Sequence, residues 1–112
     1  MTSPDVLAVA AFPELQRLID LRDAGWTFQA TGDDGHVSQV HGYRIWPGNW
    51  VDFVFVRYLT DVAAVRCTGA GDIVWGREGG LVEVVDCLID LPAPDARLAP
   101  RLVIGSSGLW TP

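Results

Sequence analysis

The first quarter of the chain has apolar residues at the spacing of an α-helix. A Ser-Pro-Asp sequence, which favours helix starts, predicts a short helix over residues 4–11. A second helix is predicted over residues 13–25, where Leu15, Leu18 and Ile19 share one stripe. The glycine at its end is suited to helix termination, because glycine adopts left-handed backbone geometry without strain.

From Trp26 onward the pattern changes to the two-residue alternation of β-strands. Clusters of Gly, Asp, Asn and Pro separate the alternating stretches and predict turns between them. Five strands are expected in succession, over residues 26–31, 36–46, 50–58, 62–69 and 73–75.

A glycine-rich break is predicted over residues 76–80, followed by a further helix. Apolar residues recur there at positions i, i+3, i+4 and i+7, and a proline stops the run, which predicts a helix over residues 81–91. The stripe consists of Leu81, Val84, Val85 and Leu88.

The remainder, residues 92–112, is rich in proline and glycine and is expected to be an extended tail. Residues 101–105 are a candidate for one more short strand. Leu109 and Trp110 are large for a free tail, so we expect them to pack back on the domain.

The order of elements predicts a single α+β domain over residues 1–112. We expect an antiparallel meander sheet of about five strands, with the N-terminal and C-terminal helices packed on one face. A strand that is buried on one side only should alternate cleanly between apolar and polar residues. The strand over residues 50–58 does not, because apolar residues occupy both of its faces.

The faces of this strand follow from its turn. A three-residue turn over residues 47–49 pairs Trp46 with Trp50, and counting outward places Arg44 opposite Asp52. One face then carries the more aromatic set, which we predict to be the core under the helices: His41, Tyr43, Ile45, Val51, Phe53 and Phe55. If the next turn also has three residues, Val65 falls opposite Phe55 and Cys67 opposite Phe53.

The other face is predicted to be an interaction surface of roughly several hundred Å². Its members combine apolar anchors with charged groups that would orient a partner: Trp46, Trp50, Tyr58, Val54, Val56, Arg44, Asp52 and Arg66. Three covers are conceivable, namely the chain's own tail or first helix, a second copy, and another protein or small ligand. We therefore expect a non-enzymatic protein-interaction module that forms a homodimer or binds another protein.

The alternative is a small-molecule-binding protein or small enzyme with a pocket between the sheet and the tail, using His41, Tyr43 and Asp52. Asp52 could act as a general acid or base, but nearby Arg44 and Arg66 favour a structural ion pair. No catalytic residue is assigned on this basis.

Cofactor and metal signals are weak. His36 and His41 point to opposite faces of one strand, so they do not suit a shared metal. The amides of Gly79 and Gly80, at a predicted helix start, are a weak candidate for anion binding, although Glu78 would repel phosphate and a plain turn explains the glycines. We expect no cofactor and no metal.

Composition narrows the class of partner. The chain has a net charge of −6, with eight arginines that form no run, so nucleic acid is not expected to bind. The apolar run over residues 6–12 is too short to span a membrane and lacks a preceding positive charge, which predicts a cytoplasmic protein. Cys67 and Cys87 are then expected to be reduced thiols.

The chain contains no lysine, and its final third includes the stretches "LPAP" and "APRLV". In these respects it resembles small uncharacterised proteins of actinobacteria. The resemblance implies no activity and transfers no functional residue.

Overall fold

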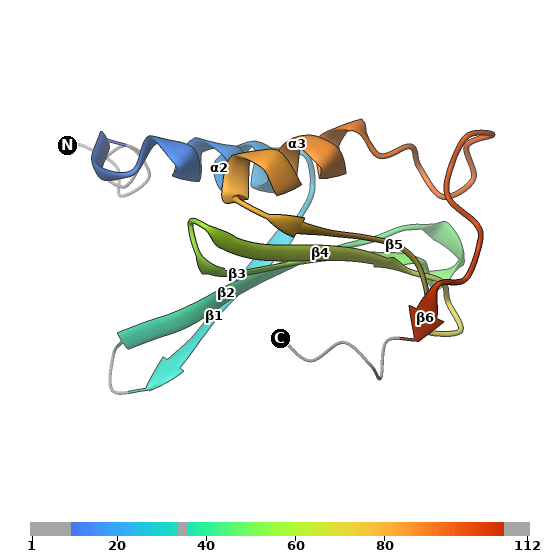
Figure 1. Cartoon of the computed structure of the whole chain (residues 1–112), viewed down its shortest axis with the longest axis horizontal. Coiled ribbons are helices and arrows are strands. Elements are labelled where there is room, and N and C mark those ends of the chain that lie inside the picture. The colour runs from blue at the N-terminus through green and yellow to red at the C-terminus, as the bar shows by residue number, and fades with distance from the viewer. Residues whose placement is uncertain (1–9, 34–35, 107–112) are drawn as a thin grey trace.

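The computed structural model describes residues 10–33 and 36–106 (Figure 1). Its centre is an antiparallel sheet whose strands follow one another in chain order. The strands are β1 (Thr27–Asp33), β2 (His36–Ile45), β3 (Val51–Tyr58), β4 (Asp61–Cys67), β5 (Asp72–Gly79) and β6 (Gly105–Ser106). The helical elements are η1 (Pro13–Leu15), α2 (Gln16–Asp23), η2 (Pro47–Asn49) and α3 (Leu81–Asp90).

Helices α2 and α3 lie on the same side of the sheet (Figure 1). The predicted α+β meander, with a helix before and a helix after it, is therefore confirmed. Helix α2 is followed by Gly25, whose φ of 108° is the left-handed geometry expected at a helix end. The predicted helix over residues 4–11 lies outside the described residues, apart from Ala10 and Ala11, which are helical.

Two predicted boundaries near the sheet edge are wrong. The break predicted over residues 76–80 is reduced to Gly80, because Gly76 to Gly79 continue β5 and pair with β4. Backbone hydrogen bonds to β4 hold these glycines extended despite their weak strand propensity. The strand predicted over residues 101–105 is reduced to β6, which pairs only with the start of β5.

The register between β2 and β3 is the predicted one. Arg44 lies opposite Asp52, and the Trp46 amide donates to the Trp50 carbonyl at 2.7 Å. The turn between them, η2, uses positive φ at Gly48 (80°) and at the residue after it (63°). The length of this turn therefore determines which residues of β2 and β3 pair, and which side of the sheet each side chain occupies.

The register between β3 and β4 differs from the prediction by two residues. Val65 lies opposite Phe53, and Arg66 lies directly opposite Asp52. The connection is tighter than predicted, and the pairing is irregular between Val56 and Tyr58. The turn is one residue shorter than predicted, and the irregular residue in β3 shifts the pairing by one more. Because the total shift is an even number of residues, the side chains keep their predicted faces.

The prediction of which face the helices cover is wrong. They pack on the face that carries Val54 and Val56, not on the face that carries the phenylalanines. Under α3 this face presents small or β-branched side chains, such as Val62 and Ala64, so a helix can approach closely. We call this surface the helix face. Burial of each large apolar α3 side chain there contributes about 1.5–3 kcal/mol, and these residues are Leu81, Val84, Val85 and Leu88.

Gly42 has a specific packing role on the helix face. The aromatic ring of Phe28, on the neighbouring strand β1, lies across it. A Cβ atom at Gly42 would come within 2.4 Å of that ring, which is shorter than atoms can approach. The absence of a side chain therefore lets Phe28 turn over β2 and join the core.

The opposite side of the sheet, which we call the distal face, carries the aromatic set. Strand alternation and the observed registers place nine apolar side chains on it: Tyr43, Ile45, Val51, Phe53, Phe55, Ala63, Val65, Cys67 and Ile73. Among the described residues, no helix packs on this side.

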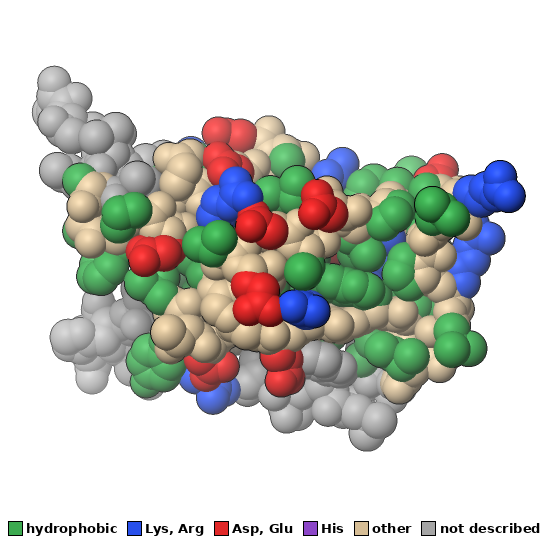
Figure 2. Space-filling view, turned by 45° about the horizontal axis from the view of Figure 1, so that its top comes forward, with side chains coloured by type: hydrophobic (Ala, Val, Ile, Leu, Met, Phe, Trp, Pro, Cys, Tyr) green, Lys and Arg blue, Asp and Glu red, His purple; other side chains and the backbone are tan. Residues whose placement is uncertain are grey.

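The outer surface of the helical layer is charged (Figure 2). Arg17 on α2 pairs with Asp86 on α3, which ties the two helices together. Arg77 on β5 pairs with Glu83 near the start of α3. These pairs are partly exposed, so each is expected to add little to stability.

Candidate functional site

The most polar group of the interior is an ion pair between Asp52 on β3 and Arg66 on β4. Arg66 donates from Nε to Asp52 Oδ1 at 2.7 Å and from Nη2 to Oδ2 at 2.9 Å. Both residues are buried, with 0% and 2% of their surfaces exposed. The predicted ion pair between these two side chains is therefore confirmed, in the bidentate geometry that an arginine fork favours.

Two further groups complete this cluster. The indole Nε1 of Trp46 donates to Asp52 Oδ2 at 2.9 Å, and Arg66 Nη1 donates to the backbone carbonyl of Pro92. Arg44, predicted as a possible partner of Asp52, instead stacks on the Trp46 ring, 4.0 Å from its centroid. The cluster therefore joins β2, β3, β4 and the segment that follows α3.

Chemically, this cluster is closed. The Asp52 carboxylate accepts three hydrogen bonds, two from Arg66 and one from Trp46. In the described part of the chain, no buried side-chain nitrogen or oxygen lacks a hydrogen-bond partner. A buried carboxylate that an arginine fork and an indole hold with three hydrogen bonds is typical of a structural cross-link rather than a general base.

The eight residues predicted as an interaction surface do not form one exposed patch. Four of them are buried beneath the chain's own helices and the segment after α3: Asp52, Val54, Val56 and Arg66. Arg44, Trp46 and Trp50 are half-buried, and only Tyr58, at 68%, is exposed. That surface prediction is wrong because the helices took the face that it assigned to a partner.

The distal face is the surface that sequence reasoning missed, because its residues were assigned to the core. Ile45 is 64% exposed, and Tyr43, Val51, Phe53 and Phe55 are half-buried. The rings of Phe53 and Phe55 lie nearly parallel, with centroids 6.1 Å apart. The glycine at position 42 and the alanine at position 64 were the available signal, because small residues mark the face that a helix can approach.

His41 is also on the distal face, where its Nε2 lies 3.1 Å from Gln29 Oε1 on β1. Asp52 is on the opposite face, so the two residues do not form a joint acid–base site. Within residues 10–33 and 36–106, no cluster of three or more His, Cys, Asp or Glu side chains could hold a metal ion. Cys67 and Cys87 are free thiols, as predicted.

At the predicted anion site, the first amide of α3 is already used within the fold. The Leu81 amide donates to the Leu59 carbonyl at 2.9 Å. The Glu83 carboxylate lies close to Gly79, where it would repel an anion. The helix start is thus used within the fold, with Gly80 at the cap position.

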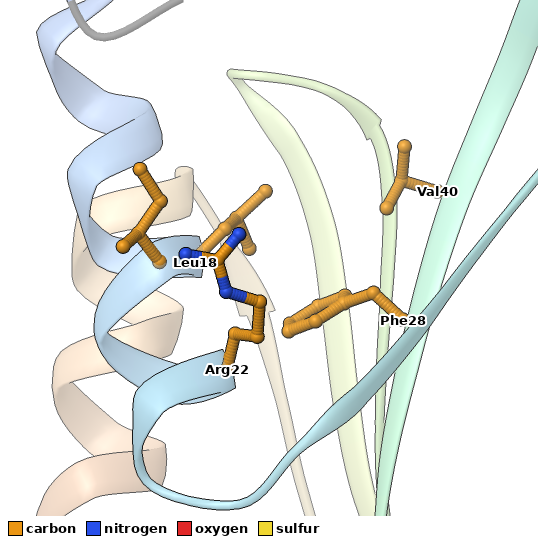
Figure 3. Close-up of a pocket in the computed structure, with 5 residues that line it drawn as sticks. Leu18, Arg22, Phe28 and Val40 are labelled. Atoms are coloured by element: carbon orange, nitrogen blue, oxygen red, sulfur yellow. The ribbon is translucent and has the colours of Figure 1, made fainter. Parts of the chain in front are cut away.

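An open pocket lies between α2 and the first two strands (Figure 3). Leu18 and Arg22 on α2 face Phe28 and Val40 across it, and Ile19 completes the lining. Its lining is mainly apolar, and it is distinct from the predicted pocket between sheet and tail.

In the described ranges, no helix combines the length and apolar character needed to cross a bilayer. No protein-family model, no curated protein and no solved structure matches the chain.

Proposed function

We propose that the chain is a non-enzymatic protein-interaction module that forms a homodimer through the β2–β3 part of its distal face. The observation that carries the proposal is that β3 is apolar on both sides, whereas both described helices cover only one. Ile45 is the most exposed member of this part, at 64%. Apolar patches of this kind on small domains are often interaction sites.

The charge distribution supports a second copy as the partner. The rows that contain Ile45 and Tyr43 continue across β3 and β4 without a charged side chain. Although the chain carries a net charge of −6, two copies could meet here without placing like charges together. A two-fold axis would bring the same rows into contact, as when two sheets pack face to face.

The area of this surface indicates how tightly two copies should bind each other. The two strands of this part, spaced about 4.8 Å apart, and five residues of about 3.4 Å each span roughly 160 Å² in projection. A standard stable interface buries about 800 Å² per partner. We therefore expect a weak dimer, with a dissociation constant on the order of micromolar or higher.

Sedimentation velocity over a range from about 5 to 500 μM, chosen to span such affinities, tests the proposal. The Ile45→Glu variant should remain monomeric throughout, because it places like charges across the two-fold axis. Ile45 is exposed, so the substitution should leave the monomer folded. The matched control is Ile89→Glu on the outer side of α3, where the isoleucine is 51% exposed and outside the distal face.

A wild-type chain that stays monomeric at the highest concentration contradicts the proposal. So does a dimer that Ile45→Glu leaves intact, since another surface would then form it. The alternative, a small-molecule-binding protein or small enzyme with a pocket between the sheet and the tail, remains a prediction.

A further inference from the structure

The loop over residues 91–104, which joins α3 to β6, exposes large apolar side chains at one end of the molecule (Figure 1). They are Leu98 (85% exposed), Leu102 (80%), Ile104 (63%) and Val103 (52%). Leu109 and Trp110, which the sequence predicts to pack back on the domain, lie outside the described residues. Apolar groups gathered on the surface of a small domain often mark a contact with a protein or a membrane.

The fold holds this loop in a defined shape. Near its start, the backbone carbonyl of Pro92 accepts a hydrogen bond from the buried Arg66. Backbone hydrogen bonds then close two turns over residues 93–99, and the side chain of Ala99 is buried. The exposed side chains are therefore presented in advance of binding, so little conformational entropy is lost when a partner covers them.

The charge of the loop is opposite to that of the rest of the protein. The loop contains Arg97 and Arg101 but only one acidic residue, Asp95, so its formal charge is +1. The other described residues contain six arginines and eleven acidic residues, so their formal charge is −5. Figure 2 shows arginine and hydrophobic side chains together at the right-hand end, where the loop lies, and most acidic side chains elsewhere on this face. The loop is thus suited to an anionic partner.

The chemistry of the apolar groups fits lipid better than protein. The residues that dominate protein interfaces are enriched in Trp, Tyr and Arg, and Leu and Val are under-represented among them. In this loop the exposed large apolar side chains are all aliphatic. A side chain that projects singly requires a complementary cavity in a protein partner, whereas fluid acyl chains close around it without one.

The two arginines supply the polar half of such a contact. A guanidinium group matches the oxygens of a phosphate with paired hydrogen bonds, and phospholipid headgroups present phosphates. Arg101 Nη2 donates to the Ala96 carbonyl at 3.1 Å, which holds this guanidinium beside the loop with further N–H donors to offer a phosphate. An anionic lipid surface adds a favourable potential for both cations.

We propose that this loop docks the protein on an anionic lipid surface, with Leu98 and Leu102 among the acyl chains and Arg97 and Arg101 at the headgroup phosphates. The irregular backbone stays at the level of the headgroups, because unpaired amides and carbonyls are costly in hydrocarbon. Insertion is therefore shallow, and binding is weak and reversible. The more acidic remainder of the molecule is directed away from the lipid.

Co-sedimentation with phospholipid vesicles tests the proposal. Nanomolar protein is used, because the proposed dimer is dissociated at that concentration and the result does not depend on it. The wild type should bind vesicles of phosphatidylcholine mixed with phosphatidylglycerol. It should bind vesicles of phosphatidylcholine alone at least about fivefold more weakly, since these lack the anionic surface potential that attracts arginine.

Two variants separate the apolar and the charged contributions. Leu98→Glu should weaken binding to the anionic vesicles at least about tenfold, because an inserted leucine is lost and a repelled charge is added. Arg97→Gln should weaken that binding about fivefold and leave binding to phosphatidylcholine alone unchanged. Both residues are exposed, so the variants should unfold at the same urea concentration as the wild type.

The matched control is Tyr58→Glu. Tyr58 is 68% exposed and lies at the end of β3 where that strand turns into β4, at the opposite end of the sheet from the loop (Figure 1). This variant introduces the same charge as Leu98→Glu and should bind the vesicles like the wild type, because a charge that is more than about 10 Å from the lipid is largely screened.

Three results overturn the proposal. The first is a wild-type chain that binds neither kind of vesicle, and the second is a Leu98→Glu chain that binds as well as the wild type. The third is equal binding of the wild type to both kinds of vesicle. If vesicles are not bound and Leu98→Glu lowers self-association in sedimentation velocity, the loop is a contact between copies instead. Homodimerisation through the distal face is decided separately by Ile45→Glu, so the failure of either proposal is distinguishable.

Discussion

The helix face and the distal face of the same sheet are both apolar, yet the chain treats them differently. On the helix face, β3 contributes Val54 and Val56, which are covered by two helices. On the distal face it contributes Phe53 and Phe55, which are bulkier and only half-buried. Helices thus cover the face of smaller residues, because their backbones can approach it closely and fill the space with their own side chains.

Polar groups are buried on the helix face and exposed on the distal face. The helix face buries the pair of Asp52 and Arg66, fixed by Trp46 and the carbonyl of Pro92. On the distal face, His41 on β2 pairs with Gln29 on β1 in an exposed position. Apolar content alone therefore does not identify the main core, since that core also contains the most buried charges.

The largest effect should come from breaking the buried pair. Arg66→Met leaves the Asp52 carboxylate buried with the Trp46 indole as its remaining described donor. We expect the free energy of unfolding to fall by about 3–5 kcal/mol, measured by urea denaturation. The control Arg57→Met removes a partner of Asp61 in an exposed pair and should cost less than about 1 kcal/mol. Equal losses of unfolding free energy in the two variants would show that the buried pair stabilises the fold no more than the exposed pair does.

An intermediate effect should separate the two faces of β3. Val54→Ala removes a side chain with 0% exposure from the helix face and should cost about 2 kcal/mol in urea denaturation at low protein concentration. Val51→Ala makes the same change on the half-buried distal face and should cost less than about 1 kcal/mol. A reversed order would mean that the distal face holds the main core.

The smallest effect should appear at high pH. Burial, followed by the charge of Asp52, raises the pKa of the Cys67 thiol above its ordinary value. The unfolded chain then loses this proton at a lower pH than the folded chain. The protonated thiol therefore stabilises the fold fully below the ordinary pKa of cysteine. This stabilisation declines as the pH rises towards the pKa of Cys67 in the folded state. The midpoint temperature of thermal unfolding, Tm, should therefore fall more steeply above pH ~9 for the wild type than for Cys67→Ala. Parallel plots of Tm against pH would contradict this expectation.

Much of the local structure could be predicted from the sequence. The stripe that begins at Leu81 specified α3, and the Pro-Gly-Asn turn fixed the pairing of β2 with β3. The register between β3 and β4 could not be predicted in the same way. A tighter turn and an irregular residue near Tyr58 together shifted it by two positions, and neither has a distinct local signal.

The candidate site was only half predictable. The sequence placed Arg66 near Asp52, because opposite charges on adjacent apolar strands rarely stay unpaired. It could not show that Pro92, from beyond α3, closes the cluster. That contact depends on where α3 lies on the sheet, which no short stretch of sequence encodes.

The sequence by itself determined the meander order, the main helix and strand positions, and the fact that β3 is apolar on both sides. These features depend on residue spacing and turn length, which act over a few positions. Only the tertiary structure decided which side the helices cover. That choice depends on how the surfaces of α2 and α3 fit two competing faces, through many small contacts between residues far apart in the chain.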